Sequence, residues 1–293
     1  MSETTENPAR ATVTGRRQGM RRRDNSREDS RMLPVLRCLR TPQTPRHRAV
    51  RCAAVLLAAV CLAAALPVLP LRAQGSWPTT HQQATWLSLS IDEPVTARTA
   101  LWFDGNWRRM GWGAEPQQVL LRPGILRTIA PGVRVGTGYA YVATAPYGEL
   151  PADAPVREHR LWQQLSLAQT IGRVSLTHRY RWEQRWIAAV ADGTVEAYHY
   201  QQRARYMVRA QRPIGRGPVA RSVFLQEEVL LPVGHGGSAG RFTQNRFGLG
   251  IGLPMGEGRR LDIGYLNLWN AVPSRSANEV NHTLTVAWVL TGR

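Results

Sequence analysis

The sequence predicts an all-β protein, namely an antiparallel up-and-down transmembrane β-barrel of ten to twelve strands. Three observations lead to this fold class. From residue 86 onward, apolar and polar residues alternate with a period of two, and no stretch shows a clear 3.6-residue period. Eleven such segments follow one another, most of them 11 to 15 residues long, whereas strands of soluble proteins usually have about five or six. Short links marked by Gly and Pro alternate with longer polar ones, which is typical of membrane-spanning barrels.

Residues 1–73 differ in composition from the rest of the chain. They contain 14 of the 38 Arg residues, all three Cys residues and none of the 22 aromatic residues. Residues 1–51 are polar and lack an apolar period, which predicts a disordered Arg-rich leader. Residues 52–71 carry no charge and follow three Arg residues, and the small residue Ala73 comes soon after, which is the layout of a secretory signal peptide.

We therefore expect residues 52–73 to be the apolar region and cleavage site of a signal peptide that is cut near Ala73. Residues 74–293 would then form the exported barrel. The alternative is an uncleaved transmembrane anchor. Pro67 and Pro70 argue against it, because the unbroken apolar run 53–66 has only 14 residues.

The period of two is clearest in residues 173–187. Successive side chains of a strand point to opposite faces, so one face carries Val, Leu, Tyr and Trp. The other face carries Arg179, Arg181, Glu183 and Arg185. Similar alternation defines eleven expected strands: 85–92, 97–108, 117–129, 133–143, 157–170, 173–187, 201–213, 219–230, 242–254, 259–270 and 280–291.

The number of strands follows from the direction of the last one. Closed single-chain barrels of bacteria have even strand counts and both termini on the periplasmic side. Counting back from the last strand makes the first expected strand run in the same direction as the last. Residues 75–84 must then form a twelfth strand or a segment that lies in the lumen; otherwise the first expected strand lies outside the barrel and ten remain. We expect twelve. We also expect long loops at 109–116, 144–156, 188–200, 231–241 and 271–279.

Period two alone does not say which face points inward. A soluble sheet would turn Arg to water, whereas a membrane barrel would turn Arg to its lumen. One Arg on the lipid face at the bilayer midplane costs about 2–4 kcal/mol, and the export signal and the long strands favour a membrane barrel. We therefore expect a polar network in the lumen, formed by Arg122, Arg160, Arg179, Arg181, Glu183, Arg185, Arg203, Arg205, Arg209, Arg246 and Asp262.

The opposite face should meet lipid and carry aromatic side chains near the membrane interfaces. The expected residues are Tyr141, Tyr180, Trp182, Trp186, Tyr265, Trp269 and Trp288. Trp102 and Trp162 have the other parity, so they require either a bulge or a place in the lumen.

Several motifs resemble those of a known family. They are the run at 158–165 (EHRLWQQL), the turn at 171–172, the segment 181–185 (RWEQR), the segment 242–246 (FTQNR) before a Gly-alternating strand, and the pairs at 264–265 and 281–282. Together they resemble a family of predicted bacterial outer-membrane β-barrels of unknown function, DUF2490. The resemblance extends from about residue 86 to residue 290. It implies the barrel fold and the outer membrane, and it brings no substrate or catalytic residue with it.

The expected function is therefore that of an outer-membrane barrel, which is either structural or lets small solutes pass. Arg exceeds the acids among the lumen residues, so a small anion is the favoured solute, and outer-membrane lipids are the expected partners. The net charge of +18 could instead suggest nucleic-acid binding. We expect no nucleic-acid partner, because the Arg residues interleave with apolar ones within strands and form no patch.

The alternative function is an outer-membrane lipid-modifying hydrolase. It would need Ser or Asp beside His on one accessible face. The sequence has no Gly-x-Ser-x-Gly motif, and His159 and Ser166 have opposite parity. We expect no catalytic residue, no cofactor and no metal site, since the six His residues after position 73 are scattered.

Overall fold

A computed structural model describes residues 77–215, 220–234 and 243–292. The expected leader and signal peptide, at 1–51 and 52–73, lie outside the described residues. Eleven long strands of 11 to 18 residues form the described chain. They are β1 Thr79–Pro94, β2 Thr99–Met110, β3 Glu115–Ala130, β4 Val133–Thr144, β5 Val156–Ile171, β6 Val174–Ala191, β8 His199–Ile214, β9 Arg221–Val233, β10 Gln244–Pro254, β11 Arg259–Val272 and β12 Ala277–Thr291. The two-residue strand β7, Thr194–Val195, extends a hairpin from β6.

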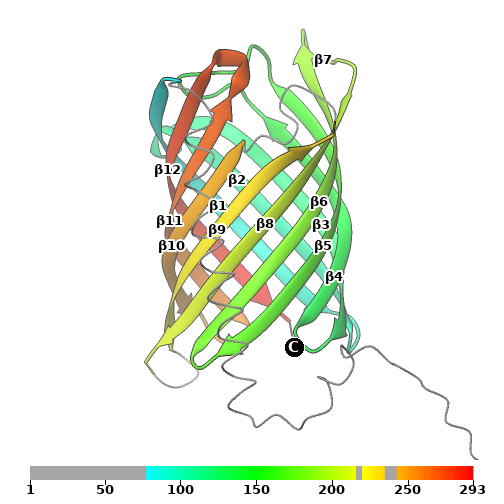
Figure 1. Ribbon diagram of the computed structural model, residues 1–293, viewed down its shortest axis with the longest axis vertical. Helices are drawn as coiled ribbons and strands as arrows, with labels where there is room; N and C mark the ends of the chain where they lie inside the picture. Colours follow the sequence, from blue (N-terminus) through cyan, green and yellow to red (C-terminus); the bar gives the residue numbers. More distant parts are fainter. Residues whose placement is uncertain (1–76, 216–219, 235–242, 293) are drawn as a thin grey trace, which may run out of the picture. The chain divides into compact units, whose positions relative to one another are not determined.

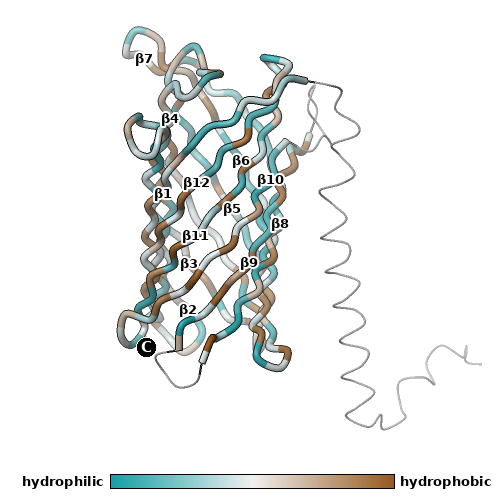
Figure 2. Tube along the Cα trace, turned by 90° about the vertical axis from the view of Figure 1, so that its left-hand side faces the viewer, coloured by the Kyte–Doolittle hydropathy of each residue, from teal (hydrophilic) through white to brown (hydrophobic). Residues whose placement is uncertain are grey.

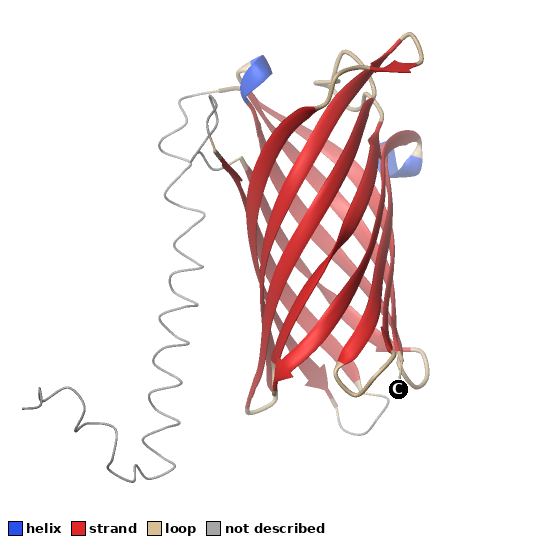
Figure 3. Cartoon of the chain, turned by 90° about the vertical axis from the view of Figure 1, so that its right-hand side faces the viewer, coloured by secondary structure: helices blue, strands red, loops and turns tan. Residues whose placement is uncertain are grey.

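The long strands close into a barrel, which confirms the predicted fold class (Figures 1 and 3). Each strand pairs antiparallel with its neighbour along the chain, and the β5–β6 pairing completes the ring. Strand β1 pairs with β12 in parallel, with Ala84 opposite Thr283 and Ser90 opposite Val289. Within the described residues, no helix has the length and apolar character needed to cross a membrane.

The expected count of twelve strands was wrong, because eleven strands close the barrel in the described part of the chain. Residues 79–84 extend β1 and do not form a separate strand. Strands β1 and β12 run in the same direction, as counting back from the last strand required. The two strands satisfy each other's backbone groups by pairing in parallel, so no twelfth strand is needed to close the barrel.

The connections differ in length between the two ends of the barrel. At one end the turns are tight, as at Gly172, whose φ of 59° suits a two-residue turn. At the other end, which we call the long-loop end, lie the links 145–155 and 192–198. Two expected loops at this end are shorter than predicted, because the strands continue to Met110 and Val272. The 3-10 turns Gly111–Gly113 and Pro273–Arg275 then close the links.

The barrel wall has two unlike faces, and Figure 2 shows hydrophilic and hydrophobic residues alternating along the strands. Large apolar side chains are exposed on the outside, including Leu101, Ile125, Leu161, Leu225 and Leu249. Most of the buried residues lie on the inner face. They include two apolar clusters, one of Ala84, Trp86, Met110, Leu266 and Leu268, and one of Leu126, Ala140 and Trp162.

Glycine on β3 and β4 makes room for one of these clusters. The Trp162 side chain is fully buried and lies against Gly124 and Gly138, where a Cβ atom would come within 2.5 Å of the indole ring. Trp102 packs against Trp162 edge to face at 5.3 Å. Both tryptophans therefore occupy the lumen, which is one of the two placements that their parity allowed.

Candidate functional site in the barrel lumen

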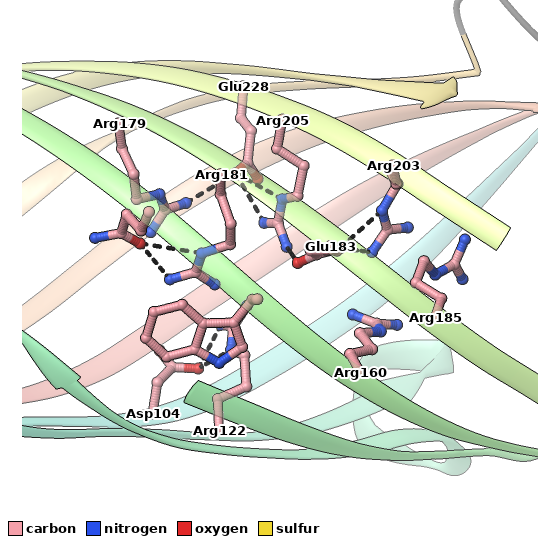
Figure 4. A network of polar contacts seen from close by, with 12 residues as sticks. Asp104, Arg122, Arg160, Arg179, Arg181, Glu183, Arg185, Arg203, Arg205 and Glu228 are labelled. Carbon is pink, nitrogen blue, oxygen red and sulfur yellow. Dashed lines mark hydrogen bonds and ion pairs between the residues drawn. The ribbon is translucent and has the colours of Figure 1, made fainter. Parts of the chain in front are cut away.

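The lumen contains a network of guanidinium and carboxylate groups (Figure 4). Each of the eleven residues expected in the lumen is hydrogen-bonded to another polar side chain on the inner face. The pairs are Arg122–Asp104, Arg160–Glu158, Arg179–Glu228, Arg181–Gln164, Glu183–Arg203, Arg185–Glu158, Arg205–Glu183, Arg209–Asp262 and Arg246–Glu228.

Two carboxylates, from the strands on either side of β8, share one guanidinium of β8 at the centre of this network. Arg205 donates to Glu183 at 2.7 Å and to Glu228 at 2.8 Å. Arg203 donates to Glu183 at 2.9 Å through its Nε atom. Glu228 also accepts hydrogen bonds from Arg179 at 2.8 Å and from another strand, β10, at 3.1 Å. Because Glu183 is only 1% exposed, its two arginines replace the water that a free carboxylate would require.

A second cluster resolves a repulsive contact between strands. Arg160 on β5 lies directly opposite Arg185 on β6 in the register. Glu158, two residues along β5, accepts two hydrogen bonds from Arg160, at 2.6 and 2.7 Å. Glu158 also accepts two from Arg185, one of them at 3.1 Å. The carboxylate thereby offsets the repulsion between two like charges that face each other, and one net positive charge remains.

Several contacts join strands that are not neighbours in the sheet, so they cross the lumen. The Arg181 guanidinium of β6 lies 5.2 Å from the ring of Trp102 on β2. It also lies 4.7 Å from the ring of Trp162 on the neighbouring strand β5. Arg209 on β8 donates to Asp262 on β11 at 2.8 Å. These contacts fill the middle of the barrel with side chains that touch each other.

A polar cavity of about 220 Å³ lies between this filled layer and the long-loop end. Seven Arg residues and one acid, Glu158, line it, together with Trp86 and Tyr147. Tyr147 comes from the loop between β4 and β5. Burial, together with the nearby charge of Glu279, raises the pKa of Tyr147 to about 12. The phenol therefore stays neutral at ordinary pH, and the positive charge of the arginines dominates the cavity.

Several charged residues of the lumen were missing from the sequence prediction. Glu158 is part of the motif at 158–165, but it was not predicted to face the lumen. Asp104 and Arg108 were not predicted to face the lumen either. Their parity could have revealed them, since Asp104 lies directly across the β2–β3 hairpin from Arg122. The side chain of Glu228 points inward, whereas its neighbour Glu227 is hydrogen-bonded to Asn245 on the outer face.

None of the seven aromatic residues expected at the lipid face is fully buried. Tyr180 and Tyr265 are exposed, and the other five, Tyr141, Trp182, Trp186, Trp269 and Trp288, are partly exposed. Tyr141 and Trp186 lie in one row across four strands, in which each residue is the register partner of the next. The row is Tyr141, His159, Trp186 and Tyr200.

The histidines of the outer face contact aromatic residues. His159 is hydrogen-bonded to Tyr139 and Tyr198, His178 to Tyr206, and His282 to Tyr265 and His81. Among the described residues, no Ser or Asp accepts a hydrogen bond from these rings or donates one to them. The same part of the chain contains no group of three or more His, Cys, Asp or Glu side chains that could hold a metal ion.

Comparison with known proteins gives one match. No curated protein and no solved structure matches the chain. The model of the family described as "Protein of unknown function (DUF2490)" matches residues 83–279, which is well over half of the chain and reaches from β1 into β12. The resemblance read from the sequence motifs is thereby confirmed, and the chain belongs to the DUF2490 family.

Proposed function

We propose that this protein is an outer-membrane β-barrel whose lumen is closed at mid-height by paired and stacked side chains, and that its role is structural. The observation that carries the proposal is the inverted arrangement of the barrel wall. Charged residues such as Glu183 and Arg205 are buried inside, while apolar residues such as Leu225, at 55%, are exposed outside. Soluble proteins rarely expose apolar patches larger than a few hundred Å². A lipid bilayer removes this cost, because the outer face then meets acyl chains.

The dimensions of the strands support the same environment. A tilted strand needs about 9–11 residues to cross the hydrocarbon core. All eleven strands of the barrel reach this length, the shortest being β10 with 11 residues. The row Tyr141, His159, Trp186 and Tyr200 lies toward the long-loop end, where amphipathic rings suit a membrane interface. The expected signal peptide, cut near Ala73, would deliver the chain to the cell envelope.

Cell fractionation tests the location. The full chain, expressed in a Gram-negative host, should be recovered in the outer-membrane fraction. Its gel migration should also change on boiling, because a closed barrel resists detergent until it is heated. Recovery as a soluble periplasmic monomer would contradict the proposal.

Planar-bilayer recording tests the closed lumen. Wild-type protein should show little steady current, whereas Arg181→Ala should raise the open-state conductance several-fold. Arg181 is the informative residue because it contacts Trp102 across the lumen and is hydrogen-bonded to Gln164, so its loss leaves no acid without its partner. The matched control is Arg173→Ala, which removes an exposed guanidinium bound to the backbone of Gly215. Large steady currents through the wild-type protein would show that the lumen is open.

A second candidate function is the passage of small anions. It is favoured by the seven arginines that line the cavity near the long-loop end. The reversal potential under a salt gradient separates the two functions. If anions pass, the potential should shift toward the equilibrium potential of the anion, and the shift should become smaller in Arg203→Gln.

A further inference from the structure

Among the described residues, two guanidinium groups of the lumen, those of Arg108 and Arg181, form no ion pair with an acid, and Arg108 is the one that lines the cavity. The side chain of Arg108 is buried, donates from Nη1 to Gln118 at 2.8 Å and lies 3.7 Å over the ring of Trp86. Its Nε atom is buried and has no hydrogen-bond partner. Its strongest interactions with charged groups are repulsive ones with other arginines, including Arg246. A buried cation surrounded in this way is stable only if an anion or solvent compensates it.

Arg246 lines the same cavity and, although it is paired with an acid, also has a buried N–H group without a partner. Its Nη atoms donate to Glu228 at 3.1 Å and Gln244 at 2.8 Å, but its buried Nε atom has no partner. Its guanidinium lies 5.5 Å from the ring of Trp86. Two guanidinium groups from β2 and β10 thus converge on one indole ring, and each has an unused N–H group.

The cavity also carries an excess of positive charge after internal pairing is counted. Six of its seven arginines, all except Arg108, are paired with four acids, of which only the first lines the cavity: Glu158, Glu183, Glu228 and Asp104. The next acid, Glu279, is hydrogen-bonded to Gln82 and Asn281. Even with Glu279 included, the arginines outnumber the acids.

We propose that this cavity is a binding site for a small oxyanion, either a carboxylate or a phosphate, with Arg108 and Arg246 as its principal ligands. Guanidinium groups form strong, charge-assisted hydrogen bonds to these anions. The volume of about 220 Å³ suits inorganic phosphate or a short dicarboxylate. It is smaller than the roughly 300–1,000 Å³ of sites for larger ligands. The inference goes beyond the proposed structural role, and it requires neither conduction nor a particular location.

Isothermal titration calorimetry on the purified protein, folded in detergent, tests this site. Inorganic phosphate and succinate are titrated separately against a sodium chloride background of matched ionic strength. We expect saturable binding of at least one of them, weakened at least tenfold by Arg108→Gln. The matched control is Arg260→Gln, whose side chain pairs with Asp262 away from the cavity and whose loss should leave binding unchanged.

A second variant supplies a carboxylate from the protein itself in place of the bound anion. Gln118→Glu places a carboxylate where Arg108 already donates at 2.8 Å, so it should abolish binding while the barrel remains heat-modifiable. This variant decides the matter if Arg108→Gln fails to fold. The proposal is overturned if neither anion binds saturably, or if binding persists in either variant. Anion binding in detergent does not depend on where the protein is located. Neither outcome therefore decides the proposed function, which the fractionation and conductance experiments test.

Discussion

At the residue scale, Glu183 is the acid on which the lumen network depends most. It is almost fully buried and accepts hydrogen bonds from Arg203 and Arg205. Glu183→Ala leaves both arginines short of a partner. Removing one member of a buried ion pair costs about 3–5 kcal/mol, so we expect a loss of this size in the free energy of unfolding. Urea unfolding of the folded protein in lipid vesicles measures it.

The control for this prediction is an exposed ion pair. Asp153 pairs with Arg275 at 2.7 Å in the loops, where the Asp153 side chain is 94% exposed. Asp153→Asn should therefore leave the unfolding midpoint unchanged. Equal stability of Glu183→Ala and the wild-type protein would mean that water, and not the arginines, solvates the carboxylate.

At the scale of single elements, glycines on β3 and β4 let the lumen hold a tryptophan. A Cβ atom at Gly124 would come 2.3 Å from the Trp162 ring, so Gly124→Ala must displace that ring. Overpacking of this kind typically costs about 1–3 kcal/mol, which denaturant unfolding can measure. Adding Trp162→Phe should recover part of the loss, because the smaller ring can move away from the new methyl group.

Gly105 on β2 provides the comparison for Gly124. Its Cβ atom would meet only the edge of the Phe103 ring, at 3.2 Å, and this side chain can rotate. Gly105→Ala should therefore cost clearly less than Gly124→Ala. Equal losses at both positions would point to strand flexibility, and not to the tryptophan, as the reason for glycine.

At the scale of the whole molecule, the parallel seam between β1 and β12 closes the barrel. All three Cys residues of the chain precede residue 74, so cysteines introduced in pairs into the mature barrel report the seam without interference. The pairs Ala84→Cys with Thr283→Cys, and Ser90→Cys with Val289→Cys, are register partners and should form disulfides on oxidation. Non-reducing gels detect the closed loop by its faster migration.

The exchanged pairs, Ala84→Cys with Val289→Cys and Ser90→Cys with Thr283→Cys, serve as controls. Each partner is then six residues out of register, or about 20 Å along the strand, which a disulfide cannot bridge. An antiparallel seam would produce the opposite result, with only the exchanged pairs cross-linked.

The sequence by itself determined the strands and which residues share a face. All eleven expected segments overlap the strands of the structure, because alternation of side chains between two faces is a local property of an extended chain. It also grouped Arg179, Arg181, Glu183 and Arg185 on one face of β6. The extension of two strands to Met110 and Val272 was not predicted, because Gly111, Gly113 and Pro273 just beyond them are typical of loops.

Only the tertiary structure decided how the barrel closes and which charges meet inside it. The parallel pairing of β1 with β12 depends on the direction of both strands around the whole ring. The contact between Arg181 and Trp102 joins strands far apart in the sheet, and the missing partner of Arg108 becomes visible only when every neighbouring charge has a position. These features depend on barrel radius and register, which result from all the strands together and are not encoded in any single segment.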